Sequence, residues 1–362
     1  MYLLIFLIIF LICYILFLYN LNNYDNFDNI ETITYDNLFN FCDNTDNPKE
    51  NVYYAIKKES TGNSVLCLGV YNNKILTLTN EWLYLIVTYY HNKKSTVVYD
   101  EIIHYYNNII SSSNSNTNIV NINENVIPFI TSFSTGTIHG YCGLFYILMQ
   151  YINNLELYKA HKILVYKNSQ KGILDIINFF INDKDIIYLE PETIYKFDSM
   201  IIIPNKYHTY SNSEFNNKVS GFIQDNIISK SLNKKTILIY PKICIMKSSI
   251  SSNLTQDGIF NNTDIINFCT KYDLVNIEPT NYNEIELIQI MNACEYFITS
   301  WGTTFLKNLI YISDKCKRII VFIYGNAFIN QYKNDPQVIT KFKSANIEYK
   351  IIHSIDEMII NL

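Results

Sequence analysis

Arginine is almost absent from this 362-residue chain, because only Arg318 among its 28 basic residues is an arginine. Glycine and proline are also scarce, at 10 and 7 residues, which excludes collagen-like and linker-like chains. Charged residues make up 17% and hydrophobic residues 49%, so an intrinsically disordered chain is excluded as well. The net charge of -5 leaves no basic surplus for nucleic acid, and we expect no nucleic-acid partner.

Several catalytic and metal-binding motifs are missing too. The sequence contains no P-loop and no GxGxxG, which argues against Walker-type and dinucleotide sites, and no GxSxG hydrolase elbow. Its one DxD triplet, Asp183-Lys184-Asp185, falls in a predicted polar turn. The eight cysteines show no CxxC or Cys/His zinc spacing. We expect no metal and no cofactor. We interpret the cysteines as reduced core residues; the alternative, for a lumenal domain, is one or two disulfides whose pairing the sequence leaves open.

The first long apolar run covers residues 2–19 and carries no charge. As a helix it would span about 27 Å, close to the thickness of a bilayer core. It lacks the basic start and the cleavage site of a signal peptide. We therefore expect a single-pass membrane anchor over residues 1–20 and an Asn/Asp-rich stem over 21–51. Lysine and arginine are absent near both ends of the run, so orientation is assigned only by analogy with anchored enzymes, with the body lumenal or extracytoplasmic.

The rest of the chain alternates between strand-like and helix-like segments, which predicts crossover units and parallel sheets. A break near 207–235 divides the alternation into two α/β domains, residues 52–212 and 213–362. A hairpin is predicted over 64–78, a strand over 96–99 and a helix over 101–110. The main strands are expected at 126–133, 163–165, 186–189, 200–203, 243–246, 274–277, 296–299 and 319–323, and the helices at 138–152, 173–181, 214–230, 264–271, 284–292 and 304–312.

The turns after strands 243–246 and 296–299 are the candidate site, because ligands of parallel sheets bind at the carboxyl ends of strands. The second turn is Ser300-Trp301-Gly302-Thr303-Thr304, where backbone N–H groups and hydroxyls suit a phosphate; ordinary helix capping is the alternative. The first turn carries Lys247 and Ser248, and a merely solvated lysine is the alternative there. His139 opens an apolar helix in the first domain and is the candidate general base, or a capping residue.

These segments also resemble glycosyltransferase family 61 over residues 128–323. That family has a His at the start of an apolar helix, matched by His139, and a strand ending in Ser-Arg, matched by residues 242–248 with Lys247 for the Arg. Its Gly-x-His-Gly-Ala motif is similar to residues 297–303, with Trp301 for the His. Asn262 and Glu286 take the places of further family positions. Gly143 replaces an acidic residue that is frequent in the family.

The resemblance implies two Rossmann-like domains in a GT-B arrangement and an inverting, metal-independent transfer of a sugar from a nucleotide sugar to a glycan or protein hydroxyl. It implies that Lys247, Ser248 and residues 302–304 bind the diphosphate. Asn262 would lie in the substrate site, Glu286 would bind the nucleoside or be a surface residue, and Trp301 would stack on a base or sugar. The alternative is a membrane protein of the same fold that binds a glycan or nucleotide sugar without turnover.

Overall fold

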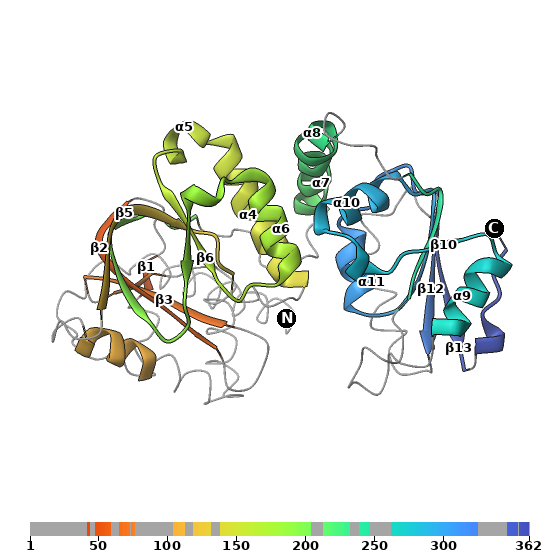
Figure 1. Cartoon of the computed structure of the whole chain (residues 1–362), viewed down its shortest axis with the longest axis horizontal. Coiled ribbons are helices and arrows are strands. Elements are labelled where there is room, and N and C mark those ends of the chain that lie inside the picture. The colour runs from red at the N-terminus through yellow and green to blue at the C-terminus, as the bar shows by residue number, and fades with distance from the viewer. Residues whose placement is uncertain are drawn as a thin grey trace, which may run out of the picture.

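The structure is a computed structural model of the whole chain. It describes residues 42–43, 48–58, 65–72, 74–76, 104–112, 119–131, 138–203, 213–231, 239–246, 262–324, 346–353 and 355–361. Within these ranges the chain builds two β-sheets with helices packed on them (Figure 1).

The first sheet has eight strands in the order β1-β4-β3-β2-β8-β5-β6-β7. Strands β8, β5, β6 and β7 run parallel to one another, whereas β2, β3 and β4 form an antiparallel meander beside β8. The strands are β1 (Cys42–Asp43), β2 (Lys49–Lys58), β3 (Val65–Tyr71), β4 (Lys74–Leu76), β5 (Ile119–Pro128), β6 (Lys162–Tyr166), β7 (Ile186–Leu189) and β8 (Ile194–Met200). The parallel strands are the ones that alternate with helices along the chain.

The second sheet is entirely parallel and has the order β10-β9-β11-β12-β13. Numbered from its first strand, this order is 2-1-3-4-5, that of flavodoxin-like doubly wound folds. The strands are β9 (Lys242–Ile245), β10 (Val275–Asn276), β11 (Tyr296–Ser300), β12 (Arg318–Tyr324) and β13 (Asn346–Ile352).

Helices cover both faces of the second sheet. In β11, Phe297 belongs to the core that contains Phe305 of α11 (Thr303–Leu309). Its neighbour Ile298 packs in the core that contains Phe268 of α9 (Asn262–Lys271). Successive strand residues point to opposite faces, so this split identifies a doubly wound layer arrangement. The longer helices are α4 (Ile138–Asn153), α6 (Lys171–Phe180), α7 (Ser213–Phe222), α9 (Asn262–Lys271), α10 (Glu284–Ala293) and α11 (Thr303–Leu309); short ones are α5 (Leu155–Tyr158), η2 (Asp183–Asp185), α8 (Ser229–Ser231), η5 (Pro279–Asn281) and η6 (Ile355–Glu357).

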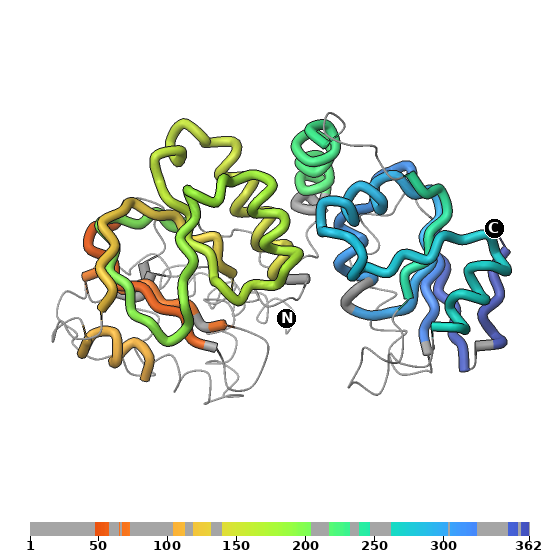
Figure 2. Tube along the Cα trace, viewed as in Figure 1, coloured from red at the N-terminus to blue at the C-terminus, as the bar shows by residue number. Residues whose placement is uncertain are grey.

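The two sheets meet through their helices. Helix α10 packs on α6, and α11 packs on α4, so two helical layers lie between the sheets (Figure 1). The tube view shows the helix of residues 213–231 beside this junction; it consists of α7, the π-helical stretch η3 (Ile223–Ile228) and α8 (Figure 2). Phe222 of this helix contacts Phe145 of α4, which also contacts Tyr311 after α11. One apolar core therefore runs from the first sheet into the second.

The predicted alternation is confirmed from residue 162 onward, where the predicted helices and most predicted strands fall on observed elements. The hairpin is also confirmed, and residues 104–112 are helical. The mixed α/β class with parallel strands is thus established.

Three predictions of detail were wrong, and one strand was missed. Strand β5 begins at Ile119 instead of residue 126. The sequence did not reveal its first seven residues, because they are mostly exposed and lack an apolar pattern. Strand β8 ends at Met200, where the predicted strand was to begin. Residues 49–51, expected in the stem, already belong to β2, and β13 was not predicted. The predicted strand at 96–99 lies outside the described residues.

The predicted membrane anchor, residues 2–19, lies outside the described residues, as does most of the stem. Among the helices in the described ranges, none combines the length and apolar composition needed to cross a membrane.

Candidate functional site

The strand order of the second sheet creates one topological switch point. Strands β9 and β11 are neighbours, with Ile245 opposite Thr299, but the chain leaves β9 toward β10 on one side and leaves β11 toward β12 on the other. The crevice beyond the carboxyl ends of two such strands is where doubly wound folds bind ligands. Here β9 ends at Ile245 and β11 at Ser300, and the described part of this edge is the turn that follows Ser300.

Gly302 makes the turn after β11 and is the N-cap residue of α11. Its φ of 149° lies in a region that side chains with a Cβ avoid, so the turn requires glycine. The backbone N–H of Trp301 donates to the carbonyl of Phe322 (2.8 Å), and the carbonyl of Gly302 accepts from Leu306 (3.2 Å). These bonds fix the turn against β12 on one side and against α11 on the other.

Trp301 is partly buried beside the turn. Its ring centroid lies 5.3 Å from that of Phe305 and 6.4 Å from that of Tyr349 in β13. The indole therefore has aromatic partners within the protein, and these hold the start of α11 against the sheet. The predicted stacking on a base or sugar stays a prediction.

The other predicted site residues fall in different settings. Lys247 and Ser248 come two and three residues after the end of β9 in the sequence and lie outside the described residues. Asn262 is the exposed first residue of α9. His139 is the second residue of α4, and Thr303 and Thr304 open α11; only their backbones are described.

Glu286 has a capping role in the structure. Its carboxylate accepts from the backbone N–H of Asn283, and the Asn283 side chain accepts from the backbone N–H of Glu286, both at 2.9 Å. This reciprocal pair is a capping box, and it satisfies two N–H groups at the start of α10. The predicted contact of Glu286 with a nucleoside stays a prediction.

Sequence reasoning missed the carboxylate of Glu284, two residues earlier. Glu284 is 5% exposed and lies where α10 meets α6 and α4. Its Oε1 accepts from the Tyr311 hydroxyl at 2.8 Å and pairs with Lys307 Nζ at 2.9 Å, and its Oε2 accepts from Tyr141 at 3.3 Å. Helix α6 contributes Asp175, whose carboxylate accepts from the backbone N–H of Glu284 (3.0 Å). We call Glu284, Lys307, Tyr141 and Tyr311 the junction cluster.

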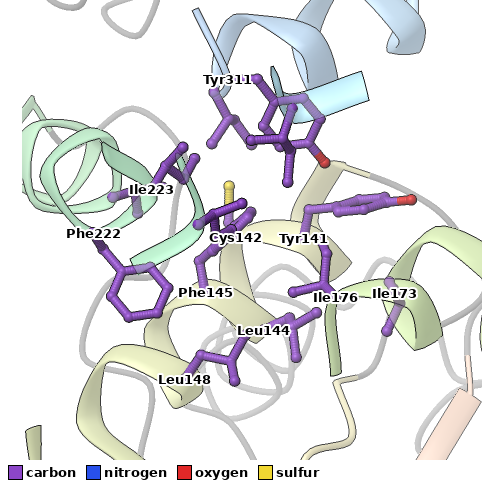
Figure 3. Packing of buried hydrophobic residues seen from close by; sticks show 14 of the residues in the cluster. Tyr141, Cys142, Leu144, Phe145, Leu148, Ile173, Ile176, Phe222, Ile223 and Tyr311 are labelled. Carbon is purple, nitrogen blue, oxygen red and sulfur yellow. The ribbon is translucent and has the colours of Figure 1, made fainter. Parts of the chain in front are cut away.

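The tyrosines of the junction cluster are neutral hydrogen-bond donors. Burial raises the pKa of both Tyr141 and Tyr311, and the nearby Glu284 carboxylate raises each pKa further. Figure 3 shows the two rings projecting from an apolar surround, and their centroids are 6.5 Å apart. Lys307 Nζ lies 5.1 Å from the Tyr141 ring centroid, so the ammonium also interacts with the π face.

A glycine makes room for the junction cluster. A Cβ at Gly172 of α6 would lie 2.2 Å from Oε2 of Glu284 and 2.4 Å from the Tyr141 hydroxyl. The close approach of α6 and α10 therefore depends on this residue having no side chain. The Tyr141 hydroxyl also lies 3.0 Å from Oε1 of Gln170, just before α6, so the cluster links α10 and α11 to α6 and α4.

Asn308 adds an unsatisfied polar group to α11. It is 1% exposed, and its Oδ1 has no hydrogen-bond partner among the described residues. A buried amide oxygen without a donor costs about 1–3 kcal/mol.

Metal ligands do not gather in this region. Across the described ranges, no group of three or more His, Cys, Asp or Glu side chains could hold a metal ion. Metal independence stays a prediction.

Comparison with known proteins gives no relative: no family model matches the chain, and no curated protein matches it.

Proposed function

We propose that this protein is a glycosyltransferase that uses a nucleotide sugar and is similar to family 61. The observation that carries the proposal is the switch point of the second sheet, where the glycine turn at Gly302 and the chain after β9 leave the same edge. Doubly wound sheets bind nucleotides at such points. In this proposal the two α/β halves form a GT-B arrangement.

The diphosphate of the donor would lie between the two turns. Lys247 supplies positive charge from the β9 side, with the Ser248 hydroxyl beside it. Thr303, Thr304 and the backbone after Gly302 supply donors from the β11 side. A cation and N–H dipoles at this point stabilise the leaving diphosphate as the glycosidic bond breaks.

The acceptor would be activated from α4. His139 lies two residues before Tyr141, and the Tyr141 ring lies against Lys307, one helical turn past Thr303. In this proposal, the contact between α4 and α11 would let the start of α4 reach the donor side. In this proposal the imidazole removes the proton of the acceptor hydroxyl as that oxygen attacks the anomeric carbon.

The donor-binding assay is the first test. The full chain in detergent is titrated with nucleoside diphosphate sugars and with the matching nucleosides. Lys247→Ala should weaken diphosphate binding by about 1.5–3 kcal/mol, or roughly 10- to 150-fold, and leave nucleoside binding unchanged. Lys317→Ala is the matched control, because Lys317 lies just before β12, at the opposite edge of the sheet. Equal losses for nucleoside and diphosphate would contradict the proposed role of Lys247.

Turnover distinguishes the enzyme from its alternative. His139→Ala should lower transfer or donor hydrolysis about 10²–10⁴-fold and leave donor affinity unchanged. A variant as active as the wild type would show that another group is the base.

The second candidate function is a binding protein without catalysis. The packing of Trp301 on Phe305 and Tyr349 favours it, because a titratable histidine is expected at that place in family 61. Nucleotide-sugar binding by the wild type with no transfer to any acceptor or to water would support this candidate.

Membrane attachment is part of the same proposal. Residues 2–19 would anchor the chain, with the body lumenal or extracytoplasmic and its acceptor a glycan or glycoprotein. Full-length protein should then resist alkaline carbonate extraction from membranes. A mature N-terminus beyond Asn20 would contradict a retained anchor.

A further inference from the structure

Four buried cysteines lie in two pairs around the second sheet. All four are reduced thiols in the structure. The Cys294 thiol donates to the Met291 carbonyl (3.2 Å) and the Cys316 thiol to the Arg318 carbonyl (3.6 Å). The thiols of Cys294 and Cys316 lie close enough to shift each other's pKa, and so do those of Cys244 and Cys269. The members of the two pairs are 22 and 25 positions apart in the sequence. Both pairs lie in the half of the chain that carries the proposed donor site.

Cys294 and Cys316 lie next to the amino ends of two neighbouring strands. In the parallel pair β11 and β12, the first paired residues are Tyr296 and Arg318, and the carbonyl of Glu295 accepts from the N–H of Lys317 at 2.7 Å. Cys294 and Cys316 each come two residues before these paired residues. Neighbouring strands lie about 4.7–4.9 Å apart, within the range of Cα separations of about 4.4–6.8 Å that a disulfide accepts.

Cys244 and Cys269 face each other across a strand and its covering helix. Cys244 is in β9, Cys269 is in the last turn of α9, and both belong to the core between them. Backbone bonds hold both residues: Cys269 accepts from Leu274 at 2.9 Å, and Cys244 accepts from Ile277 at 2.9 Å. These two hydrogen bonds therefore join the connection between α9 and β10 to the backbone of both cysteines.

We propose that Cys294–Cys316 and Cys244–Cys269 are two disulfide sites that form by exchange with a disulfide oxidant, either oxidised glutathione or a protein disulfide. In each pair, one thiolate attacks the oxidant to give a mixed disulfide and releases one thiolate. The second cysteine thiolate then attacks its partner's sulfur and releases the other. Two protein thiols are oxidised and one oxidant disulfide is reduced to two thiols, with the two protein protons ending on the released thiolates.

Each disulfide would close a loop that carries one side of the switch point. The segment from Cys294 to Cys316 contains β11, the Gly302 turn and α11, and the segment from Cys244 to Cys269 contains Lys247 and Ser248. Oxidation would therefore restrain both turns. The cysteine inference itself does not depend on glycosyl transfer.

The test is a disulfide map of the full chain. Purified protein in detergent is held overnight in a glutathione redox buffer, denatured, alkylated and digested, and the peptides are identified by mass spectrometry. We expect cross-linked peptides joining Cys294 to Cys316 and Cys244 to Cys269. Cys67, which lies in β3 of the first sheet, should be recovered alkylated. Other pairings, stable glutathione adducts or four alkylated thiols would overturn the proposal.

A stability measurement on matched variants supplies a second readout. The double variant Cys294→Ser with Cys316→Ser should unfold roughly 5–10 °C below the oxidised wild type, and reductant should abolish most of this difference. Cys67→Ser is the control, and its Tm should fall by the same amount with and without oxidant. A wild-type Tm that does not respond to reductant after oxidation would contradict the proposed disulfides.

Discussion

Replacing Glu284 with glutamine tests how the two halves are held together. The carboxylate is 5% exposed and receives both Lys307 and the Tyr311 hydroxyl. Lys307 Nζ lies 2.9 Å from one carboxylate oxygen and 3.2 Å from the other, so in either rotamer a glutamine NH₂ would lie near the ammonium. Glu284→Gln therefore leaves the largely buried Lys307 ammonium without its counter-charge. It also places two hydrogen-bond donors, the amide NH₂ and the ammonium, next to each other.

The expected loss follows from the burial of both partners. Removing one member of a buried ion pair costs about 3–5 kcal/mol, because the remaining charge is uncompensated. The Lys307 side chain is 18% exposed to solvent. This partial exposure shifts the expected loss toward the lower end of the range, about 3 kcal/mol. Tyr311→Phe removes only one hydrogen bond to the carboxylate and should cost about 1.5–3 kcal/mol.

Urea denaturation of the wild type and the variants measures these losses. Adding Lys307→Met to Glu284→Gln should restore much of the stability, because the unpaired cation is then gone. Glu295→Gln is the matched control: it removes the carboxylate of a solvent-exposed ion pair with Lys317 and should leave the midpoint unchanged. A loss below about 1 kcal/mol for Glu284→Gln, or no recovery in the double variant, would refute the reasoning.

Four further predictions concern other residues. Gly172→Ala should lower stability by about 1–3 kcal/mol in the same denaturation assay, whereas Gly221→Ala, whose Cβ meets nothing within 4 Å, should raise it by up to about 1 kcal/mol. Burial lowers the pKa of His161, so stability should fall as the pH drops below about 6.5, and His161→Asn should flatten that slope. Hydrogen bonding to Arg318 lowers the pKa of Glu348, so its contribution is present above about pH 4.3 and lost at lower pH; Glu348→Gln should remove this acid-range dependence. Asn308→Leu should be neutral or stabilising by calorimetry, and a loss of stability would show that Oδ1 has a donor.

The sequence predicted the second sheet better than the first for a physical reason. Parallel strands covered on both faces are short apolar runs, and Ile319 to Ile323 in β12 is such a run. The half-exposed strands of the first sheet carry no such run: β5 begins with exposed polar residues, and β2 mixes lysine and tyrosine with its apolar positions.

The candidate site was predictable only where it depends on local sequence. A strand followed by Gly302 and two threonines marks a turn at the carboxyl edge, and the structure gives that turn the expected glycine conformation. Glu284 and Glu286 look alike in sequence, because both open a helix. Tertiary packing separates them: the first is buried against another helix, and the second caps its own. The sequence pattern does not reveal which glutamate meets α4 and α6.

The continuous core described above has a consequence for folding. Apolar residues of β6 and β12, such as Val165 and Val321, belong to one cluster, and helix 213–231 contributes Ile227 to it. A chain cut at the predicted boundary after residue 212 would expose the apolar faces of α4 and α6 on one fragment and of α10 and α11 on the other. The two halves therefore depend on each other to form a cooperative folding unit, and any motion that opens the junction must first solvate the ion pair within it.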